Sequence, residues 1–145
     1  MSNIRVKVAW ITRSVNNYFN SNYSETAVHY PNAPFDSQSQ TEWVYFRCEA
    51  FDDDAFAGVH RGEFQIRATV LCARTSQADR LDEIQDAIAA VLRQQMITVY
   101  AYGTSSSATM GYVSVYEPNS VDMQELPGEV QQREVVFKAW FDGAA

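Results

Sequence analysis

A change of hydrophobic period inside one continuous run, residues 61–96, constrains the fold more than any other feature of this sequence. Apolar and polar residues alternate over 64–72, which is the pattern of a half-buried strand. Over 81–92 the apolar residues instead recur every three or four positions, so they share one face of a helix. Ser76 is placed as the N-cap of that helix. After Met96 the period returns to two, and the sequence therefore predicts a strand–helix–strand unit around which the rest of the chain packs.

Similar patterns predict the remaining elements. A first amphipathic helix is expected over residues 3–20, ended by the polar residues at 20–22. Loops are expected at 36–41, 52–58, 103–111 and 117–128, the last because it holds two prolines. The predicted strands are 26–30, 43–51, 64–72, 97–100, 112–116 and 131–142. Short connections favour an α+β fold in one domain, 1–145: a mostly antiparallel or mixed sheet of five to six strands, with two amphipathic helices packed on one face.

Composition excludes several classes of protein. The formal net charge of -7 argues against a nucleic-acid-binding surface, which needs clustered Lys and Arg. No apolar run approaches the roughly 20 residues of a membrane-spanning helix, and the N-terminus lacks the apolar core of a signal peptide. Cys48 and Cys72 both fall on the apolar phase of their strands, which favours two buried free thiols in a reducing cytoplasm. A disulfide between neighbouring strands remains the alternative.

Residues that carry chemistry are few. The chain has 2 histidines, no cysteine pair with zinc-ligand spacing, and no recognisable hydrolase or metalloprotease motif. Cys48 or Cys72 with a histidine is a conceivable nucleophile and base, but buried structural thiols explain the pattern better. The sequence therefore predicts no enzyme activity, no cofactor and no metal site.

Interaction surfaces are the stronger candidates. The acidic run Asp52-Asp53-Asp54 lacks the alternating spacing of a calcium loop, so a contact with a neighbouring subunit is favoured over cation binding. The aromatic residues on the non-core phase of the strands pair with one another across the sheet or form an oligomer interface. The candidate subunit or partner interface consists of Asp52, Asp53, Asp54, Phe56, His60, Arg61, Trp43, Tyr45 and Trp140.

Several stretches resemble a known family. They are Tyr-Pro-Asn-Ala-Pro-Phe at 30–35, Trp-Val-Tyr-Phe-Arg at 43–47, Arg-Gly-Glu-Phe-Gln-Ile at 61–66, and Asp-Ala-Ile-Ala-Ala-Val-Leu at 86–92. With the N-terminal helix and the final strand, they resemble the tail terminator proteins of bacteriophages with long non-contractile tails, in particular the lambda-like group. The resemblance covers most of the chain, and residues 117–128 are longer than that pattern suggests.

The resemblance implies a structural virion protein. Such a protein caps the tail tube as a hexameric ring, ends tube polymerisation, and offers a docking surface to the head connector. The implied partners are copies of the chain itself, the tail tube protein and the head connector or neck proteins, while DNA passes through the lumen without specific binding. The implied location is the head-proximal end of the virion tail, after synthesis in the host cytoplasm.

Other functions remain open on the sequence alone. A neck component or another minor tail protein shares the small α+β fold and ring assembly. A small enzyme or ligand-binding domain needs a pocket with convergent polar groups. A cellular adaptor protein is a further alternative.

Overall fold

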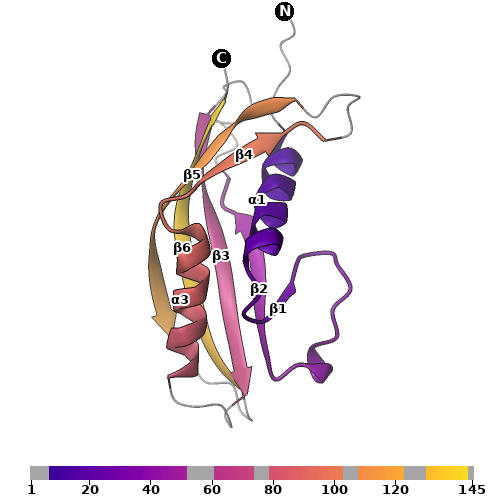
Figure 1. Cartoon of the computed structure of the whole chain (residues 1–145), viewed down its shortest axis with the longest axis vertical. Helices are drawn as coiled ribbons and strands as arrows, with labels where there is room; N and C mark the ends of the chain where they lie inside the picture. Colours follow the sequence, from indigo (N-terminus) through magenta and orange to yellow (C-terminus); the bar gives the residue numbers. More distant parts are fainter. Residues whose placement is uncertain (1–6, 52–60, 74–78, 103–107, 123–129, 144–145) are drawn as a thin grey trace, which may run out of the picture.

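The computed structural model describes residues 7–51, 61–73, 79–102, 108–122 and 130–143. Figure 1 shows two helices lying against one curved sheet; the helices are α1 (Val8–Asn22) and α3 (Arg80–Leu92), and the short 3-10 helix η1 spans Ser37–Ser39. The sheet has six strands in the order β1-β2-β3-β6-β5-β4. Their bounds are β1 Ala27–His29, β2 Glu42–Glu49, β3 Arg61–Ala73, β4 Met96–Tyr100, β5 Thr109–Asp122 and β6 Val130–Gly143. The predicted α+β fold with two helices and a mixed sheet is confirmed.

All neighbouring strands are antiparallel except β1 and β2, which are parallel. The predicted strand–helix–strand unit is present, but its two strands, β3 and β4, are not neighbours. Helix α3 carries the chain across β6 and β5, because the β5–β6 hairpin formed later in the chain occupies the places between them. Three successive antiparallel pairings, β3 with β6, β6 with β5 and β5 with β4, leave β3 and β4 antiparallel to each other.

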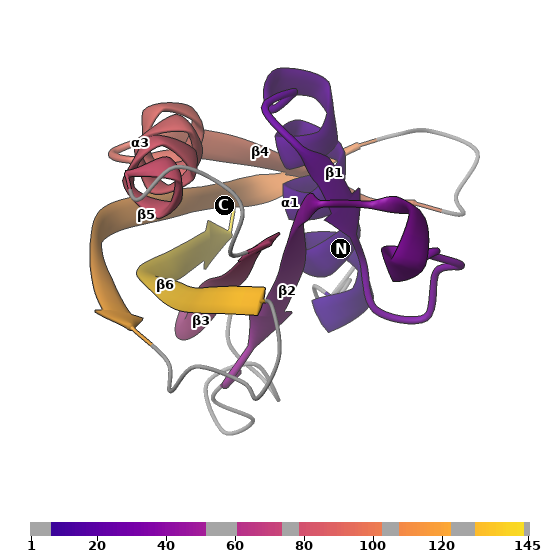
Figure 2. The ribbon, with the colours of Figure 1, turned by 90° about the horizontal axis from the view of Figure 1, so that it is seen from below.

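The sheet curls around its own apolar face (Figure 2), and the buried side chains of both helices and of that face form one hydrophobic cluster. Helix α1 packs against both β4 and β2, so it bridges the two arms of the curled sheet, while α3 packs on β3 and β6. The cluster therefore lies between the inward face of the sheet and the two helices, as the amphipathic patterns predict. The opposite, outward face of the sheet carries no helix of the described residues.

Helix α1 buries the side chains that its periodicity indicates, with Ile11, Val15 and Phe19 all fully buried. The ring of Phe19 stacks on that of Phe46 in β2, with 4.0 Å between ring centroids. Val8, which has the helical spacing of these buried residues, is 37% exposed, because it lies in the first turn beyond the edge of the cluster. The helix also continues through Asn22 rather than ending at Asn20, since the backbone N–H of Tyr23 still bonds to the carbonyl of Phe19.

Helix α3 buries Ile84, Ile88 and Leu92 against the sheet, as predicted. The N-cap assignment is not supported. The helix begins at Arg80 with Asp79 in the N-cap position, no capping side-chain bond forms, and Ser76 lies outside the described residues.

Strand β5 is longer than predicted, and it includes residues that were expected to lie in two loops. Thr109–Asp122 form one strand, so both the end of the 103–111 loop and the beginning of the 117–128 loop belong to the sheet. Pro118 is tolerated because a β-bulge between Val115 and Pro118 shifts the register against β6.

The two cysteines are free, and a bridge between them is excluded by the register. Cys48 lies opposite Ile66, whereas Cys72 lies opposite Glu42, at the other end of the same pair of strands. Cys72 is buried and Cys48 only partly, and burial raises the pKa of the Cys48 thiol to about 12.

Candidate interaction surfaces

The predicted loop candidates Asp52, Asp53, Asp54, Phe56 and His60 lie outside the described residues. The other four candidates lie on the outward face of the sheet, but the structure divides them between two regions. Trp43 and Tyr45 lie opposite Leu71 and Thr69 of β3. Trp140 lies opposite Glu63, and Arg61 is two residues before Glu63, at the far end of β3.

Trp43 and Tyr45 have aromatic partners within their own chain. The turn after β1 folds Phe35 onto His29, with the two rings stacked 4.9 Å apart, and Phe35 also lies 6.3 Å from the ring of Trp43. The His29 ring is in turn 4.9 Å from that of Tyr45. This aromatic cluster explains the Pro-rich stretch at 30–35, which turns the chain back over the edge of the sheet.

Between the two regions lies a group of four charged side chains that was not predicted from the sequence, here called the charge network: Arg47, Glu49, Arg67 and Glu134. Arg67 pairs with Glu49 at 2.6 Å and with Glu134 at 2.5 Å. Arg47 pairs with Glu49 at 3.1 Å and with Glu134 at 3.7 Å. The charges balance and span β2, β3 and β6, so the network ties three strands together. The sequence shows that the four side chains fall on the outward phase of their strands. Which of them pair depends on the register between the strands, which the sequence does not show.

A second ion-pair cluster fixes the start of α3. The Arg80 guanidinium donates to both carboxylate oxygens of Glu42 in β2, at 2.5 and 2.9 Å, and to Glu25 at 2.8 Å. The bond from Arg80 holds the pKa of the Glu42 carboxyl below its usual value. These ion pairs join the start of α3 to β2 and to the segment before β1.

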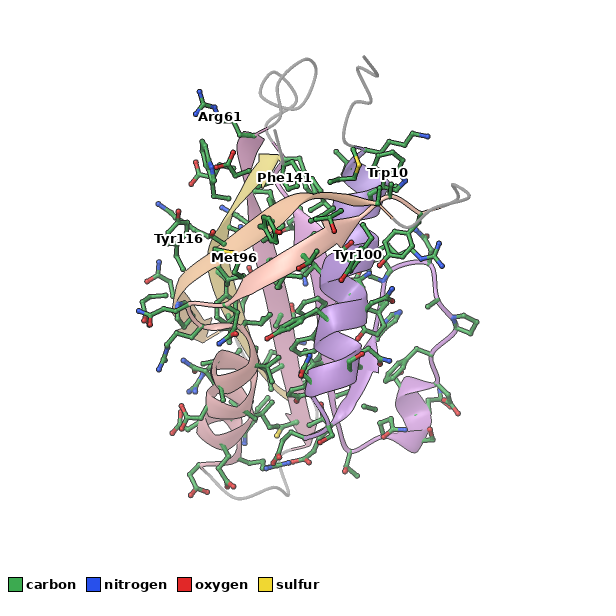
Figure 3. The ribbon with its side chains drawn as sticks, turned by 45° about the horizontal axis from the view of Figure 1, so that its top comes forward. Trp10, Arg61, Met96, Tyr100, Tyr116 and Phe141 are labelled. Atoms are coloured by element: carbon green, nitrogen blue, oxygen red, sulfur yellow. The ribbon has the colours of Figure 1, made fainter. Side chains whose placement is uncertain are left out.

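The largest exposed apolar side chains gather on the outward face of β4, β5 and β6. Of the six such residues in the described ranges, five lie there: Met96 at 66%, Tyr100 at 40%, Tyr112 at 42%, Tyr116 at 52% and Trp140 at 36% exposure. The register places Met96 and Trp140 on either side of Ser114, in adjacent strands. Met96, Tyr100 and Tyr116 are labelled on these strands in Figure 3. These five residues are called the outer sheet patch, and their types are those enriched in protein interfaces.

Helix α1 packs along the edge of the sheet beside this patch. Strand β4 is the last strand, and α1 bonds to the backbone at its C-terminal end. The N–H of Tyr100 donates to Ser14 Oγ at 3.1 Å, and the indole N–H of Trp10 donates to the carbonyl of Tyr102 at 3.0 Å. These two bonds disfavour edge pairing with another chain at the C-terminal end of β4.

The solvent side of α1 forms an elongated hollow. This helix cleft has a volume of about 560 Å³ and is lined by Ala9, Thr12, Arg13, Asn16, Asn17, Asn20 and Tyr30. Two buried polar atoms at this site, Asn16 Oδ1 and the Tyr30 hydroxyl, have no hydrogen-bond partner. Burial raises the pKa of Tyr30 to about 12.

The metal-ligating residue types are dispersed over the described residues. No cluster of three or more His, Cys, Asp or Glu with metal-binding geometry occurs among them. The ring of His29 is stacked against that of Phe35. Neither α1 nor α3 is long and apolar enough to cross a membrane. No protein-family model matches this chain, and no curated protein matches it.

Proposed function

We propose that this chain is a structural protein of a bacteriophage virion, a tail terminator that assembles as a hexameric ring at the head-proximal end of the tail tube. The outer sheet patch is the observation that carries this proposal. A face with Met96, Tyr112 and Trp140 exposed is costly to leave in water and is suited to burial against another protein. The resemblance of the sequence to tail terminators suggests the assembly, a ring on the tail tube, in which these side chains would be buried.

The proposed mechanism is geometric. A contact between unlike faces of neighbouring subunits generates a ring when the rotation between them closes on itself. Such a ring has two different ends: one matches the last layer of tube protein, and the other faces the head connector. Because the second end does not match the tube protein, no further layer is added.

The net charge of -7 suits a ring through which DNA passes. An acidic lumen would repel the phosphate backbone, so the genome would not be retained by the Lys and Arg contacts that hold DNA to other proteins. An assembled ring with a basic lumen would contradict this part of the proposal.

The test combines oligomer mass with binding to tail tubes. The purified chain is examined by light scattering coupled to size exclusion, alone and with preformed tubes, and the tube ends are imaged by electron microscopy. A hexamer, or a monomer that becomes a ring at one end of the tube and stops its growth, supports a terminator. Binding to isolated head connectors but never to tubes would indicate a neck protein instead. A monomer that binds neither would refute the proposal.

The helix cleft supports one alternative, a small ligand-binding domain. Its volume of about 560 Å³ falls in the range of small-molecule sites. Its lining residues are mainly Asn, Thr and Arg, which would supply the polar groups that orient a ligand. Thermal unfolding against a library of polar metabolites would test this alternative, and a ligand-dependent rise in Tm that Asn17→Leu abolishes would favour it.

A further inference from the structure

Strand β4 leaves part of its free edge open beside α1. We propose that this open edge, residues 96–98, is a peptide-binding site that takes up one extended, uncharged segment of a partner protein as an added antiparallel strand. The backbone register of β4, the hollow beside the strand and the lining of that hollow carry the proposal. The site needs only one subunit, so it does not rest on the proposed ring.

The register of β4 fixes which of its backbone groups face the free edge. The carbonyl of Gln95, just before the strand, accepts the N–H of Val115 in β5 at 2.9 Å. Tyr100 points its N–H to the opposite side, onto α1. Because bonding directions alternate along an antiparallel strand, Met96 and Thr98 share the direction of Tyr100. Their N–H and C=O groups therefore face the free edge, and they bond to no described residue.

The open edge lies between two contacts with α1. At one end the N–H of Tyr100 donates to Ser14 Oγ at 3.1 Å. At the other end the Tyr18 hydroxyl donates to Oε1 of Gln95 at 3.4 Å. Between these contacts β4 runs obliquely to α1 (Figure 1), and the helix and the strand border a hollow of about 330 Å³, here called the edge hollow. The edge is thus accessible near Met96, which is 66% exposed.

The edge hollow has no charged residue in its lining. Helix α1 contributes Asn17, Ser21 and Asn22 to one wall, and β4 contributes Met96 and Tyr100 to the other. The amide nitrogens of Asn17 and Asn22 already donate within the chain, at 3.2 and 2.8 Å, which holds both side chains in place. An occupant can donate to their oxygens, whereas a charge that it buried here would have no opposite charge beside it.

An extended peptide is the occupant that matches these backbone groups. It carries donors and acceptors at the spacing of a strand, so it can satisfy Met96 and Thr98 together. In the antiparallel direction, the residues directly opposite Met96 and Thr98 make all of these bonds. A parallel segment would have to extend opposite Tyr100 to make as many, and Ser14 occupies that place. The added strand is therefore antiparallel to β4.

The same register predicts the sequence of the bound segment. Residues that lie directly opposite each other in an antiparallel pair share a face of the sheet. The two residues opposite Met96 and Thr98 would thus lie beside the exposed Met96 and Tyr100, which favours apolar or aromatic side chains. The residue between them, opposite the buried Ile97, would point towards α1 and the edge hollow, which favours Ser, Thr or Asn.

Hydrogen exchange in the isolated chain is the first test. The probes are capped peptides of about six residues, a usual strand length, in which Val or Tyr alternates with Ser or Thr. At about ten times the peptide Kd, the Met96 and Thr98 amides should exchange about 10-fold more slowly, whereas Ile97, which bonds to β5, should change less. The proposal is wrong if none of the peptides binds at about 1 mM, or if binding leaves these two amides unprotected. It is also wrong if both are already protected in the free chain, since another segment of the chain then occupies the edge.

Matched variants at Thr98 are the second test. Thr98→Pro removes the N–H that faces the open edge and no bond to β5, and edge strands accept proline at such a position. Thr98→Val is the control, because it keeps both the N–H and the β-branched shape. The proline variant should bind the peptide about 10-fold more weakly or worse, and the control should bind like the wild type. Equal binding by both variants would overturn the added strand.

A third test leaves the protein unchanged. Backbone nitrogens of the bound peptide are methylated one at a time, which should abolish binding at alternate positions only, because alternate N–H groups point to β4. Tolerance of methylation at every position would contradict the proposal. These measurements are separate from ring assembly: a chain that binds the peptide but never forms rings keeps the site and refutes the terminator, and rings from a chain that binds no peptide show the reverse.

Discussion

Ser14→Ala tests how α1 is joined to the edge of the sheet. Ser14 is 3% exposed and is the only buried polar side chain found among the described residues. Its Oγ accepts the backbone N–H of Tyr100 at 3.1 Å, which joins the middle of α1 to the last residue of β4. The substitution removes the acceptor and leaves that N–H facing a methyl group inside a protein contact. No other contact of α1 needs to change.

The magnitude follows from two opposing effects. A buried donor that loses its partner costs about 1–3 kcal/mol. Alanine is the better helix former, which returns about 0.5 kcal/mol. The free energy of unfolding should therefore fall by about 0.5–2.5 kcal/mol, and Tm by about 2–4 °C per kcal/mol for a domain of this size. Urea unfolding measures the first quantity and calorimetry the second, and the Tyr100 amide should exchange faster with solvent.

Ser21→Ala is the matched control, since Ser21 lies on the same helix but is exposed. There only the propensity effect acts, so the control should be slightly more stable than the wild type. The two substitutions are thus predicted to have opposite signs. Equal shifts in both variants would show that the Ser14–Tyr100 bond contributes nothing, and the account of how α1 joins the edge would fail.

Three further predictions concern the core, a close approach of two paired strands, and an ion pair. Ile88→Ala, at a fully buried site in α3, should lower the free energy of unfolding by about 2–5 kcal/mol in urea titrations, and a change below about 1 kcal/mol would contradict its burial. Gly111→Ala should cost more than about 1 kcal/mol in the same assay, because φ is +149° and an added Cβ would lie 2.3 Å from the carbonyl oxygen of Asp142; a neutral result would refute the close approach of β5 and β6. The lowered pKa of Glu42 predicts a stabilisation that is present above its ordinary pKa of 4.5 and is lost as the pH falls through the lower folded value. Arg80→Met should therefore be less stable than the wild type at pH 7, with the difference narrowing at acid pH, and a constant difference would exclude the ion pair as its source.

The local elements were largely predictable because their signals are local. Alternation over 64–72 and the three-and-four spacing over 81–92 both reflect which side of an element is buried. Boundaries were less predictable. Strand β5 continues through Pro118 because a bulge absorbs the residue that lacks an N–H, and no nearby residue announces a bulge. Helix α3 begins only at Arg80, where its side chain reaches Glu42, a partner distant in sequence.

The positions of the candidate interface residues in the sheet were predicted in part. The prediction that Trp43, Tyr45 and Trp140 lie on the non-core face of the sheet was correct. The alternating pattern alone could not show that they lie in two different regions of that face. Phe35 packs beside Trp43 through a turn of the chain, whereas Trp140 lies next to Ser114 and near Met96 on strands that β5 and β6 bring together. The charge-poor solvent side of α1 was present in the sequence as Asn, Ser and Thr, and it became a candidate surface only when the helix was seen to border a cleft.

The sequence by itself determined the kinds of element, their order, and the face that each one buries, because these depend on the spacing of apolar residues along a short stretch of chain. The tertiary structure decided which strands are neighbours. Insertion of the β5–β6 hairpin separates β3 from β4, and that separation places Met96 beside Ser114 and Trp140. It also puts β4 at the edge, where α1 bonds to its C-terminal end. The outer sheet patch and the edge beside it are products of pairing between residues far apart in the chain, and local periodicity holds no record of that pairing.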